Sequence, residues 1–139
     1  MKNLLLSLCV FFSLAACNED ENKEQDSMVI GSWVLTEIYG SDGGQGSWNG
    51  VENGFVYTFN SDMTFTSTRF SECTYGEYSV IDNLLTLKFG CEGFDTGIEN
   101  SPGTFTENMS FEGEVLILSP DYMNCDEGCS YKFKRIKNE

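Results

Sequence analysis

The segment CDEGC, from Cys125 to Cys129, holds two thiols across three intervening residues in a chain with six cysteines and no histidine. Two thiols at this spacing can form half of a metal site, a redox-active dithiol or a disulfide across a tight turn. A redox thiol needs a nearby cation to stabilise its thiolate, whereas Asp126 and Glu127 have the opposite effect. Gly128 can adopt a positive φ and close the turn, so the segment favours a structural disulfide.

The first residues predict that the chain is exported, which bears on the chemistry of its cysteines. Lys2 precedes a short apolar run at 4–16, typical of a secretory signal peptide and shorter than the about 20 residues that span a bilayer. The run ends in LAAC at 14–17, which resembles the lipobox of bacterial lipoproteins; an ordinary secretory peptide with an incidental cysteine is the alternative. The resemblance implies removal of residues 1–16 and a membrane anchor of acyl chains, palmitate among them, on Cys17.

Residues 17–28 follow as a polar tether, CNEDENKEQDSM, that lacks aromatic and β-branched residues. Such a segment cannot bury enough surface to fold, so we expect it to be disordered, with a span of roughly 20 Å. The acidic run after Cys17 also resembles the surface-export signal of Bacteroidota lipoproteins, although a plain solvating tether has the same composition. We therefore expect an outer-membrane lipoprotein, exposed on the cell surface if the acidic run acts as an export signal.

The charge of the chain bears on its partners. Lysine and arginine number 8 and aspartate and glutamate 22, which gives a net charge of −14. This charge repels nucleic-acid phosphates and anionic headgroups, so we expect no nucleic-acid partner. Residues 29–139, about 110 in all, suit one compact domain, which we expect to be monomeric.

Few side chains could carry out catalysis. The chain has no histidine, its cysteines are expected to be oxidised, and it contains no nucleophile elbow or metal-ligand motif. Only carboxylates and tyrosines remain as acids or bases. We therefore expect a protein without enzymatic activity, metal or cofactor.

Apolar and polar residues alternate with the period of a half-buried strand in eight segments. These segments are 30–39, 54–60, 63–70, 74–81, 84–89, 103–111, 114–119 and 129–136. No helical period of useful length interrupts them. The pattern predicts an all-β domain.

The connections between these segments alternate in length. Tight turns are expected at 61–62, 82–83 and 112–113, and long loops at 40–53, 90–102 and 120–128. Alternate connections of an up-and-down meander lie at opposite ends, so the tight turns share one end and the long loops the other. Eight such strands can close into an antiparallel up-and-down β-barrel. This barrel would have a closed floor and a loop-rimmed mouth.

Over residues 29–137 the chain resembles the small bacterial lipocalin-like domains. The matching segments are GSW at 31–33, similar to the GxW of the first lipocalin strand, TFNSDMTF at 58–65 and GEYSV at 76–80. In that family the tryptophan plugs the barrel floor and a late basic residue packs over it. The resemblance implies these roles for Trp33 and Arg135. The chain departs from classical lipocalins because it lacks a TDY-like turn after the sixth strand and a C-terminal helix.

Four cysteines remain once Cys17 is acylated and the signal peptide is removed. They are Cys73, Cys91, Cys125 and Cys129, and all four fall at the predicted mouth. An even number of cysteines outside the cytoplasm favours disulfides. The expected pairs are 73–91 and 125–129, and cross-pairing stays open.

The 73–91 pair depends on the register of the hairpin between the two cysteines. A two-residue turn at 82–83 keeps one apolar side but sets Cys91 opposite Thr74. A one-residue bulge at Gly90 would bring Cys91 level with Cys73.

Two charged side chains are predicted to point into the upper barrel. Arg69 lies on the same face of its strand as the inward Phe65. Glu107 lies on the same face as the inward Phe105. A lone buried charge is costly, whereas a pair, or a charge that meets a polar ligand, can be accommodated. The alternative is that the strand ends fray and both side chains reach water.

These side chains indicate how a small apolar or amphipathic ligand would be held at the mouth. Arg69, Glu107 and Tyr57 would bind its polar end. Phe55 and Met109 would line its apolar part, a common division of roles in concave sites.

Trp48 lies in the glycine-rich segment GSDGGQGSWNG at 40–50, where it could clamp a ligand, stack on a sugar or fold over the mouth. The alternative function is a solid barrel that binds a protein or glycan through its mouth loops. Inward aromatic and aliphatic side chains are numerous enough to fill the interior to native density. The sequence leaves both functions open.

Overall fold

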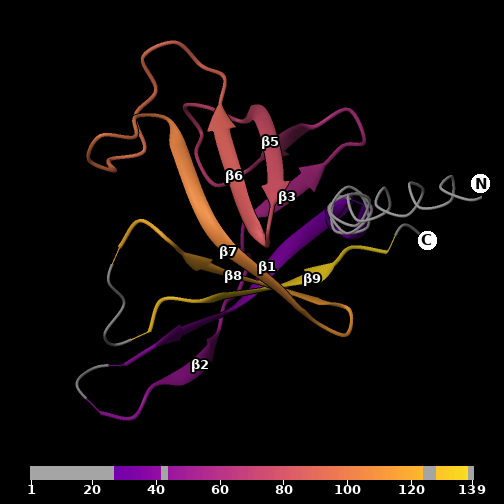
Figure 1. Cartoon of the computed structure of the whole chain (residues 1–139). Helices are drawn as coiled ribbons and strands as arrows, with labels where there is room; N and C mark the ends of the chain where they lie inside the picture. Colours follow the sequence, from indigo (N-terminus) through magenta and orange to yellow (C-terminus); the bar gives the residue numbers. More distant parts are fainter. Residues whose placement is uncertain (1–26, 42–43, 124–127, 138–139) are drawn as a thin grey trace, which may run out of the picture.

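The computed structural model describes residues 27–41, 44–123 and 128–137 (Figure 1). The predicted signal peptide, Cys17, Cys125 and all but the last two residues of the predicted tether lie outside this part of the chain. Within it the chain is all-β apart from one helical turn at 27–29. No helix of the described residues is long and apolar enough to cross a membrane.

The described residues form nine strands. They are β1 (Gly31–Gly40), β2 (Ser47–Gly50), β3 (Val56–Phe59), β4 (Thr64–Ser67), β5 (Tyr75–Ile81), β6 (Leu84–Phe89), β7 (Thr104–Glu112), β8 (Val115–Pro120) and β9 (Tyr131–Arg135). Neighbours pair in the order β2-β1-β3-β4-β5-β6-β7-β8-β9, and β1 also pairs with β9. This last pairing closes β1 and β3 to β9 into an eight-stranded ring, with β2 added beside it (Figure 1). The predicted eight-stranded antiparallel up-and-down barrel is therefore confirmed.

The strands form where the sequence alternates. In β6, Leu85, Leu87 and Phe89 are buried while the residues between them are not. A period of two places such residues on one face of a strand, here the inner face of the barrel. The largest fully buried side chains are Trp33, Tyr57, Phe59, Phe65 and Phe133. Aromatic rings thus fill much of the interior.

β1 contains a bulge that simple alternation does not predict. Its register against β9 shifts between Leu35 and Glu37. The extra residue, Thr36, reverses which side chains face inward. Ile38 therefore packs against the core, while Glu37 pairs with Lys132 on the outer face.

The segment predicted as a long loop at 40–53 folds into a hairpin instead. β2 pairs with the last four residues of β1, from Glu37 opposite Gly50 to Gly40 opposite Ser47. The chain returns to the barrel at Gly54, where a side chain would collide with the backbone of Leu35. β2 escaped prediction because four residues are too few for alternation to indicate a strand.

The tight turns lie at the barrel end that holds the start of β1 and the end of β9 (Figure 1). At the β5–β6 turn Asp82 and Asn83 have φ of 50° and 65°, the positive values that a two-residue type I′ hairpin requires. The β3–β4 turn lies beside Gly31, the partner of Phe59. The β4–β5 and β6–β7 connections, the end of β8 and the start of β9 lie at the opposite end, the mouth.

Trp33 closes the floor of the barrel. Its indole N–H donates to the carbonyl of Val29 at 2.7 Å, and the guanidinium of Arg135 lies 4.2 Å from its ring centroid. The same guanidinium donates to the carbonyls of Ile30 and Met28, which holds it over the indole. Trp33 and Arg135, to which the lipocalin-like resemblance assigned the floor, are therefore in contact.

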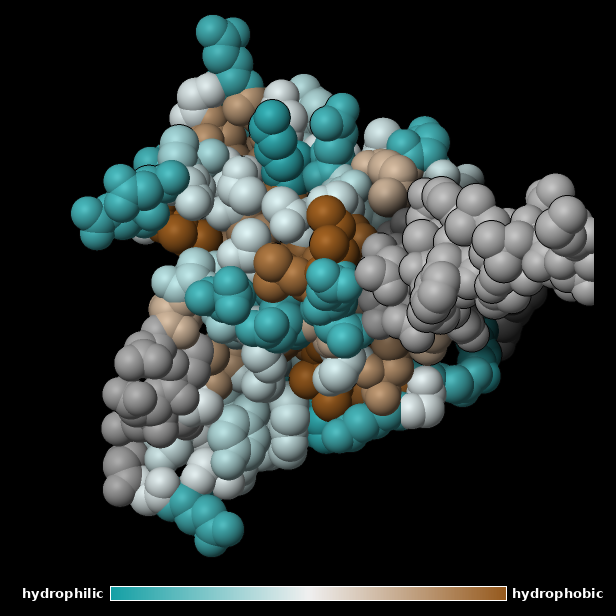
Figure 2. Space-filling view, in the orientation of Figure 1, coloured by the Kyte–Doolittle hydropathy of each residue, from teal (hydrophilic) through white to brown (hydrophobic). Residues whose placement is uncertain are grey.

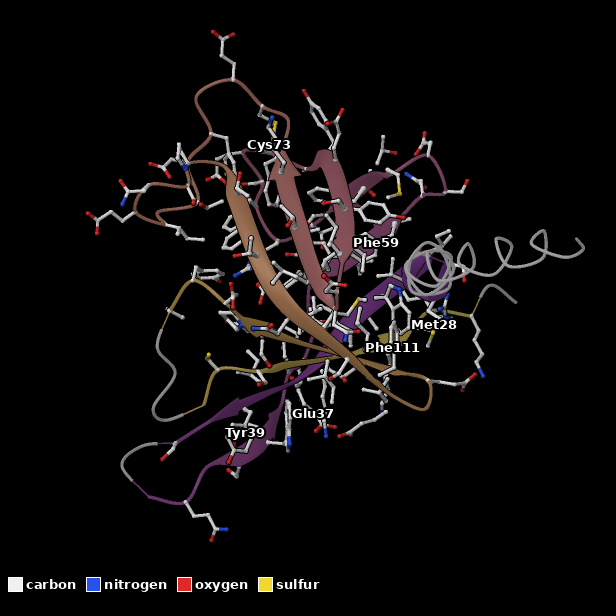
Figure 3. The ribbon with its side chains drawn as sticks, in the orientation of Figure 1. Met28, Glu37, Tyr39, Phe59, Cys73 and Phe111 are labelled. Atoms are coloured by element: carbon white, nitrogen blue, oxygen red, sulfur yellow. A yellow bond between two sulfur atoms is a disulfide. The ribbon has the colours of Figure 1, made fainter. Side chains whose placement is uncertain are left out.

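The glycine of the GSW segment permits this stacking. Gly31 has φ of +125°, a value that favours glycine, and a Cβ there would meet the guanidinium of Arg135. On its other side the indole of Trp33 packs against Phe111, with ring centroids 5.9 Å apart; Figure 3 labels Phe111 and Met28 at this end. The floor is thus sealed by aromatic and cationic side chains together.

Cys73 and Cys91 form the predicted disulfide, with Cα atoms 5.7 Å apart. The β5–β6 register shows no shift, so the bulge expected at Gly90 is absent from this ladder. Instead, the Gly90 N–H continues the ladder by donating to the Tyr75 carbonyl at 3.0 Å. The cysteines lie just beyond the last paired residues of β5 and β6, where the disulfide joins the two segments without a bulge in the ladder.

The second predicted disulfide falls only partly within the described residues. Cys129 is disulfide-bonded. Cys125 lies outside the described residues, so its pairing with Cys129 stays a prediction.

Candidate functional site

Three polar side chains that were predicted to bind a ligand meet at the mouth. Tyr57 lies on β3, Arg69 follows the end of β4, and Glu107 lies on β7. Arg69 Nη1 donates to the Tyr57 hydroxyl at 3.2 Å. The charges of Arg69 and Glu107 also influence each other. We call Arg69, Tyr57 and Glu107 the mouth cluster.

The backbone of Arg69 is held in place by the end of β4. Ser67 is buried, and its hydroxyl accepts a hydrogen bond from the Arg69 N–H at 3.0 Å. The Ser67 N–H donates to the carbonyl of Thr74 at 2.8 Å, which ties the segment to the start of β5. The strand therefore ends at Ser67 rather than at residue 70 as predicted. This early end lets both Arg69 and Phe70 contact the interior.

Four aromatic rings surround the guanidinium of Arg69. Its Cζ lies 4.3 Å from the ring centroid of Phe105, 5.3 Å from those of Phe55 and Phe70, and 5.9 Å from that of Tyr131. The negative faces of aromatic rings attract a cation. This environment stabilises a partly buried positive charge without a directly bonded carboxylate.

Glu107 is the most unusual member of the mouth cluster. Its side chain belongs to the barrel interior, with 2% of the residue exposed, and its Oε2 has no hydrogen-bond partner among the described residues. Ion pairs within 4.0 Å in the described part of the chain join Lys132 to Glu112 and Lys137 to Glu114, so Arg69 does not form one with Glu107. Burial raises the pKa of Glu107 to about 7, and the charge of Arg69 lowers it in part. Buried polar atoms are nearly always paired, so this oxygen is the atom of the mouth cluster at which a hydrogen-bond donor would gain most.

Two tyrosine hydroxyls complete the polar surroundings. Burial raises the pKa of Tyr57 to about 12, and Arg69 lowers it in part. Burial likewise raises the pKa of Tyr122 to about 12, with a further contribution from the negative charge of Glu107. Both hydroxyls therefore stay protonated at neutral pH. The mouth cluster and Tyr122 together offer a cation, two hydroxyl donors and one unpaired acceptor.

The two apolar residues predicted for the site, Phe55 and Met109, lie at different depths in the barrel. Phe55 contacts Arg69 and packs edge-to-face on Tyr57, with ring centroids 5.2 Å apart. Met109 is buried in the core on β7, two residues nearer the floor than Glu107. Phe55 thus belongs to the site, and Met109 lies beneath it.

Trp48 does not reach the mouth cluster. It lies on β2, packs edge-to-face on Tyr39 at 5.3 Å, and has the Lys132 ammonium 4.1 Å from its ring centroid. Lys132 points away from the interior because it alternates with the inward Tyr131 and Phe133. The prediction that Trp48 lies in a rim loop is therefore wrong. The bulge in β1 and the β1–β2 hairpin carry it to the outer face.

Sequence reasoning missed Phe70 and Tyr122 as members of this site. Strict alternation through residue 70 would place Phe70 on the opposite face of the strand from Arg69. Its ring instead stacks on Phe105, with planes 6° apart, and Tyr122 packs on the same ring at 5.6 Å. Phe70 directly follows Arg69, which was predicted to point into the barrel. An aromatic residue at that position was the signal that could have identified Phe70.

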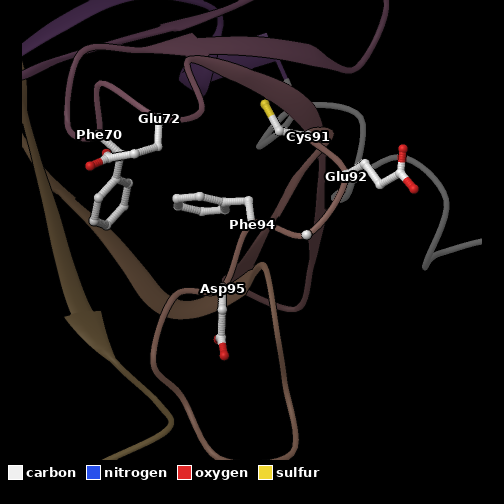
Figure 4. A pocket seen from close by; sticks show the side chains of 7 residues that line it. Phe70, Glu72, Cys91, Glu92, Phe94 and Asp95 are labelled. Carbon is white, nitrogen blue, oxygen red and sulfur yellow. The ribbon is translucent and has the colours of Figure 1, made fainter.

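The mouth also holds an open depression of about 440 Å³. Its lining residues are Phe70, Glu72, Cys91, Glu92, Gly93, Phe94 and Asp95 (Figure 4). Beneath it, ring contacts continue into the barrel from Phe89 to Phe65 at 5.1 Å and from Phe65 to Phe59 at 6.3 Å. The interior below the mouth is therefore packed with rings. Among the described residues, no group of three or more Cys, Asp or Glu side chains is arranged to hold a metal ion.

Comparison with known proteins gives a fold relationship. No family model matches the chain. No curated protein matches it. A crystal structure of an uncharacterized protein from Bacteroides eggerthii DSM 20697 matches with a TM-score of 0.53 and 17% sequence identity. The match covers 78% of this chain and 99% of that one, and that protein also has an eight-stranded barrel fold.

Proposed function

We propose that this chain is a membrane-anchored, lipocalin-like lipoprotein whose barrel is a non-enzymatic binding module for a small amphipathic ligand at the mouth. The observation that carries the proposal is the unpaired, buried Oε2 of Glu107 near Arg69. A polar group that pairs with this oxygen would remove the cost of burying it. The eight-stranded barrel supports the proposal because barrels of this size hold one small ligand at most.

The chemistry of the mouth indicates how the ligand would be oriented. Its polar end would accept hydrogen bonds from Arg69 and the tyrosine hydroxyls and donate one to Glu107. Its apolar part would pack on Phe55 and Phe70. Because rings fill the barrel below, the ligand would occupy the mouth and contact Met109 with its innermost atoms only.

Native mass spectrometry of the protein purified from the membrane of the organism that makes it tests this proposal. We expect the spectrum to show a species heavier than the acylated polypeptide by the mass of one small molecule. The species should disappear after mild organic extraction while the barrel stays folded. A spectrum of the acylated polypeptide alone would count against the ligand site.

The anchor is a separate part of the proposal. Replacing Cys17 with alanine should release the protein from the membrane fraction, because the acyl chains would have no attachment site. Fractionation followed by detection of the protein measures this. Full retention of the Cys17→Ala variant in the membrane would refute the lipobox interpretation.

Exposure on the cell surface would follow from the export signal after Cys17. Protease added to intact cells should then degrade the domain while periplasmic control proteins survive. A protected domain would place it on the inner side of the outer membrane.

A second candidate function is a barrel that binds another macromolecule through its mouth. The packed ring network beneath the mouth and the open depression beside it favour this function. In that case the barrel is a rigid support, and the β6–β7 loop contacts the partner.

A further inference from the structure

The depression at the mouth has an aromatic floor. Phe70 and Phe94 pack edge-to-face with ring centroids 5.2 Å apart, and Figure 4 shows the Phe94 ring pointing toward Phe70 within the depression that both residues line. Phe94 is supported from below by Phe89, whose centroid is 5.0 Å away. Phe70 already has the guanidinium of Arg69 5.3 Å from its centroid. Phe94 is therefore the ring of this pair that is available to an incoming group.

The rim of the depression is acidic, and its described lining residues include no lysine or arginine. Glu72, Glu92 and Asp95 are exposed, and none of them has an ion-pair partner within 4.0 Å among the described residues. Asp95 uses one carboxylate oxygen to accept a hydrogen bond from the Gly97 N–H at 2.9 Å. Figure 4 shows the Glu72 carboxylate beside Phe70, with Glu92 and Asp95 directed outward. Together with a net charge of −14, the rim creates a negative potential over two rings.

The depression is held in shape by covalent and backbone bonds. Cys91 in its lining is bonded to Cys73, which fixes the start of the β6–β7 loop to the start of β5. The Phe94 N–H donates to the Cys91 carbonyl at 3.2 Å, and Gly93 between them has φ of +74°. Figure 2 shows hydrophilic side chains projecting around hydrophobic ones on the surface of the loops. A rigid rim lowers the cost of ordering the surface on binding.

We infer that this depression binds a lysine or arginine side chain presented by a partner polypeptide. The aliphatic stem would pack on Phe70, and the cation would lie over Phe94 and face Glu72. An aromatic face below a negative rim attracts a cation attached to an apolar stem. The inference rests on the second candidate function, contact with a macromolecule through the mouth, and names the chemistry of that partner.

The shape of the depression favours a polypeptide over a free small cation. Small-molecule sites enclose most of the ligand surface. This depression is open to solvent, so a small cation would stay largely in water. A polypeptide gains the rest of its affinity from contacts around the rim.

Binding of fluorescently labelled hexalysine, followed by anisotropy at 0.15 M ionic strength, tests the inference on the full barrel domain. Glu72→Gln should weaken binding by about 5-fold or more, because it removes the carboxylate beside the rings. Phe94→Leu keeps an apolar side chain but removes the aromatic face, and should weaken binding by about 3-fold. Glu77→Gln, an exposed carboxylate on β5 outside the lining of the depression, makes the same change of charge and should alter binding by less than about 2-fold.

Three results would overturn the inference. If hexalysine does not bind the wild-type domain, the inference that the partner presents a lysine or arginine side chain is wrong. Equal weakening by Glu72→Gln and Glu77→Gln would assign the binding to net charge. Tetramethylammonium that competes as strongly per cation as hexalysine would assign the depression to a small organic cation. The retained ligand in the native mass spectrum is measured separately, so the ligand site at Glu107 can stand or fail independently of this inference.

Discussion

The substitution Glu107→Gln is expected to raise the free energy of unfolding of the domain by about 3 kcal/mol above pH 7. Burial raises the pKa of Glu107 from its ordinary value of 4.5 to about 7, although Arg69 lowers it in part. The unfolded chain therefore releases this proton near pH 4.5, and the folded domain releases it near pH 7. Between these values the folded state binds more protons, so the free energy of unfolding falls as the pH rises.

The difference between the two pKa values sets the size of the effect. The loss of stability is absent below pH 4.5 and complete above pH 7. Glutamine does not ionise, so the variant should resemble the wild type at pH 4 and exceed it by about 3 kcal/mol at pH 8. Urea unfolding at both pH values, followed by circular dichroism, measures the difference.

Glu77→Gln is the control for this experiment because Glu77 is exposed on β5. Its pH dependence should follow that of the wild type. A Glu107→Gln curve that stays parallel to the wild-type curve from pH 4 to pH 8 would show that the carboxylate is solvated or already paired.

The substitution Trp33→Ala should lower the free energy of unfolding by about 4 kcal/mol. Trp33 is 1% exposed, and its removal would open a cavity between Phe111 and Arg135. It would also leave the Val29 carbonyl without its 2.7 Å hydrogen bond. Urea unfolding at pH 7, followed by circular dichroism, gives the loss.

Trp48→Ala provides a matched comparison, since the chain has two tryptophans. Trp48 is partly exposed on the outer face, where it contacts Tyr39 and Lys132. Its removal should cost about 1 kcal/mol or less. Similar losses for the two variants would contradict the assignment of Trp33 to the floor.

The parts of the fold that could be predicted are those in which one local rule decides the outcome. Strict alternation and the two-residue turn at 82–83 determine the β5–β6 hairpin, including the pairing of Tyr78 with Leu87. The 73–91 disulfide was also predicted, but the bulge at Gly90 that was expected to align its cysteines is absent from the ladder. The lengths of the connections then indicated which end of the barrel is the floor and which is the mouth. This inference needed no knowledge of contacts between distant residues.

The parts that could not be predicted depend on backbone irregularities that leave no periodic signal. A single extra residue at Thr36 reverses the face of the upper half of β1. The β1–β2 hairpin uses that half of β1 and carries Trp48 away from the mouth. Alternation assumes an unbroken strand, so it predicted a rim loop at this position.

The mouth cluster was predictable in part for the same reason. Arg69 and Glu107 share a face with inward aromatic residues, and alternation brings them to the interior near Tyr57. The four rings around Arg69 and the unpaired oxygen of Glu107 depend on how the loops pack, which the order of residues does not reveal. The early end of β4 at Ser67, which lets Phe70 contact the interior, was likewise not predictable from the sequence.

The most direct test of the mouth cluster as a ligand site is the dissociation constant of the ligand extracted from the native protein, measured for two variants by isothermal titration calorimetry. Arg69→Ala removes a charged donor from the cluster and should raise the dissociation constant by about 10- to 100-fold. Lys134→Ala removes the same charge from the outer face of β9 and should leave the constant unchanged. Equal effects of the two substitutions would contradict a ligand site built on Arg69, Tyr57 and Glu107.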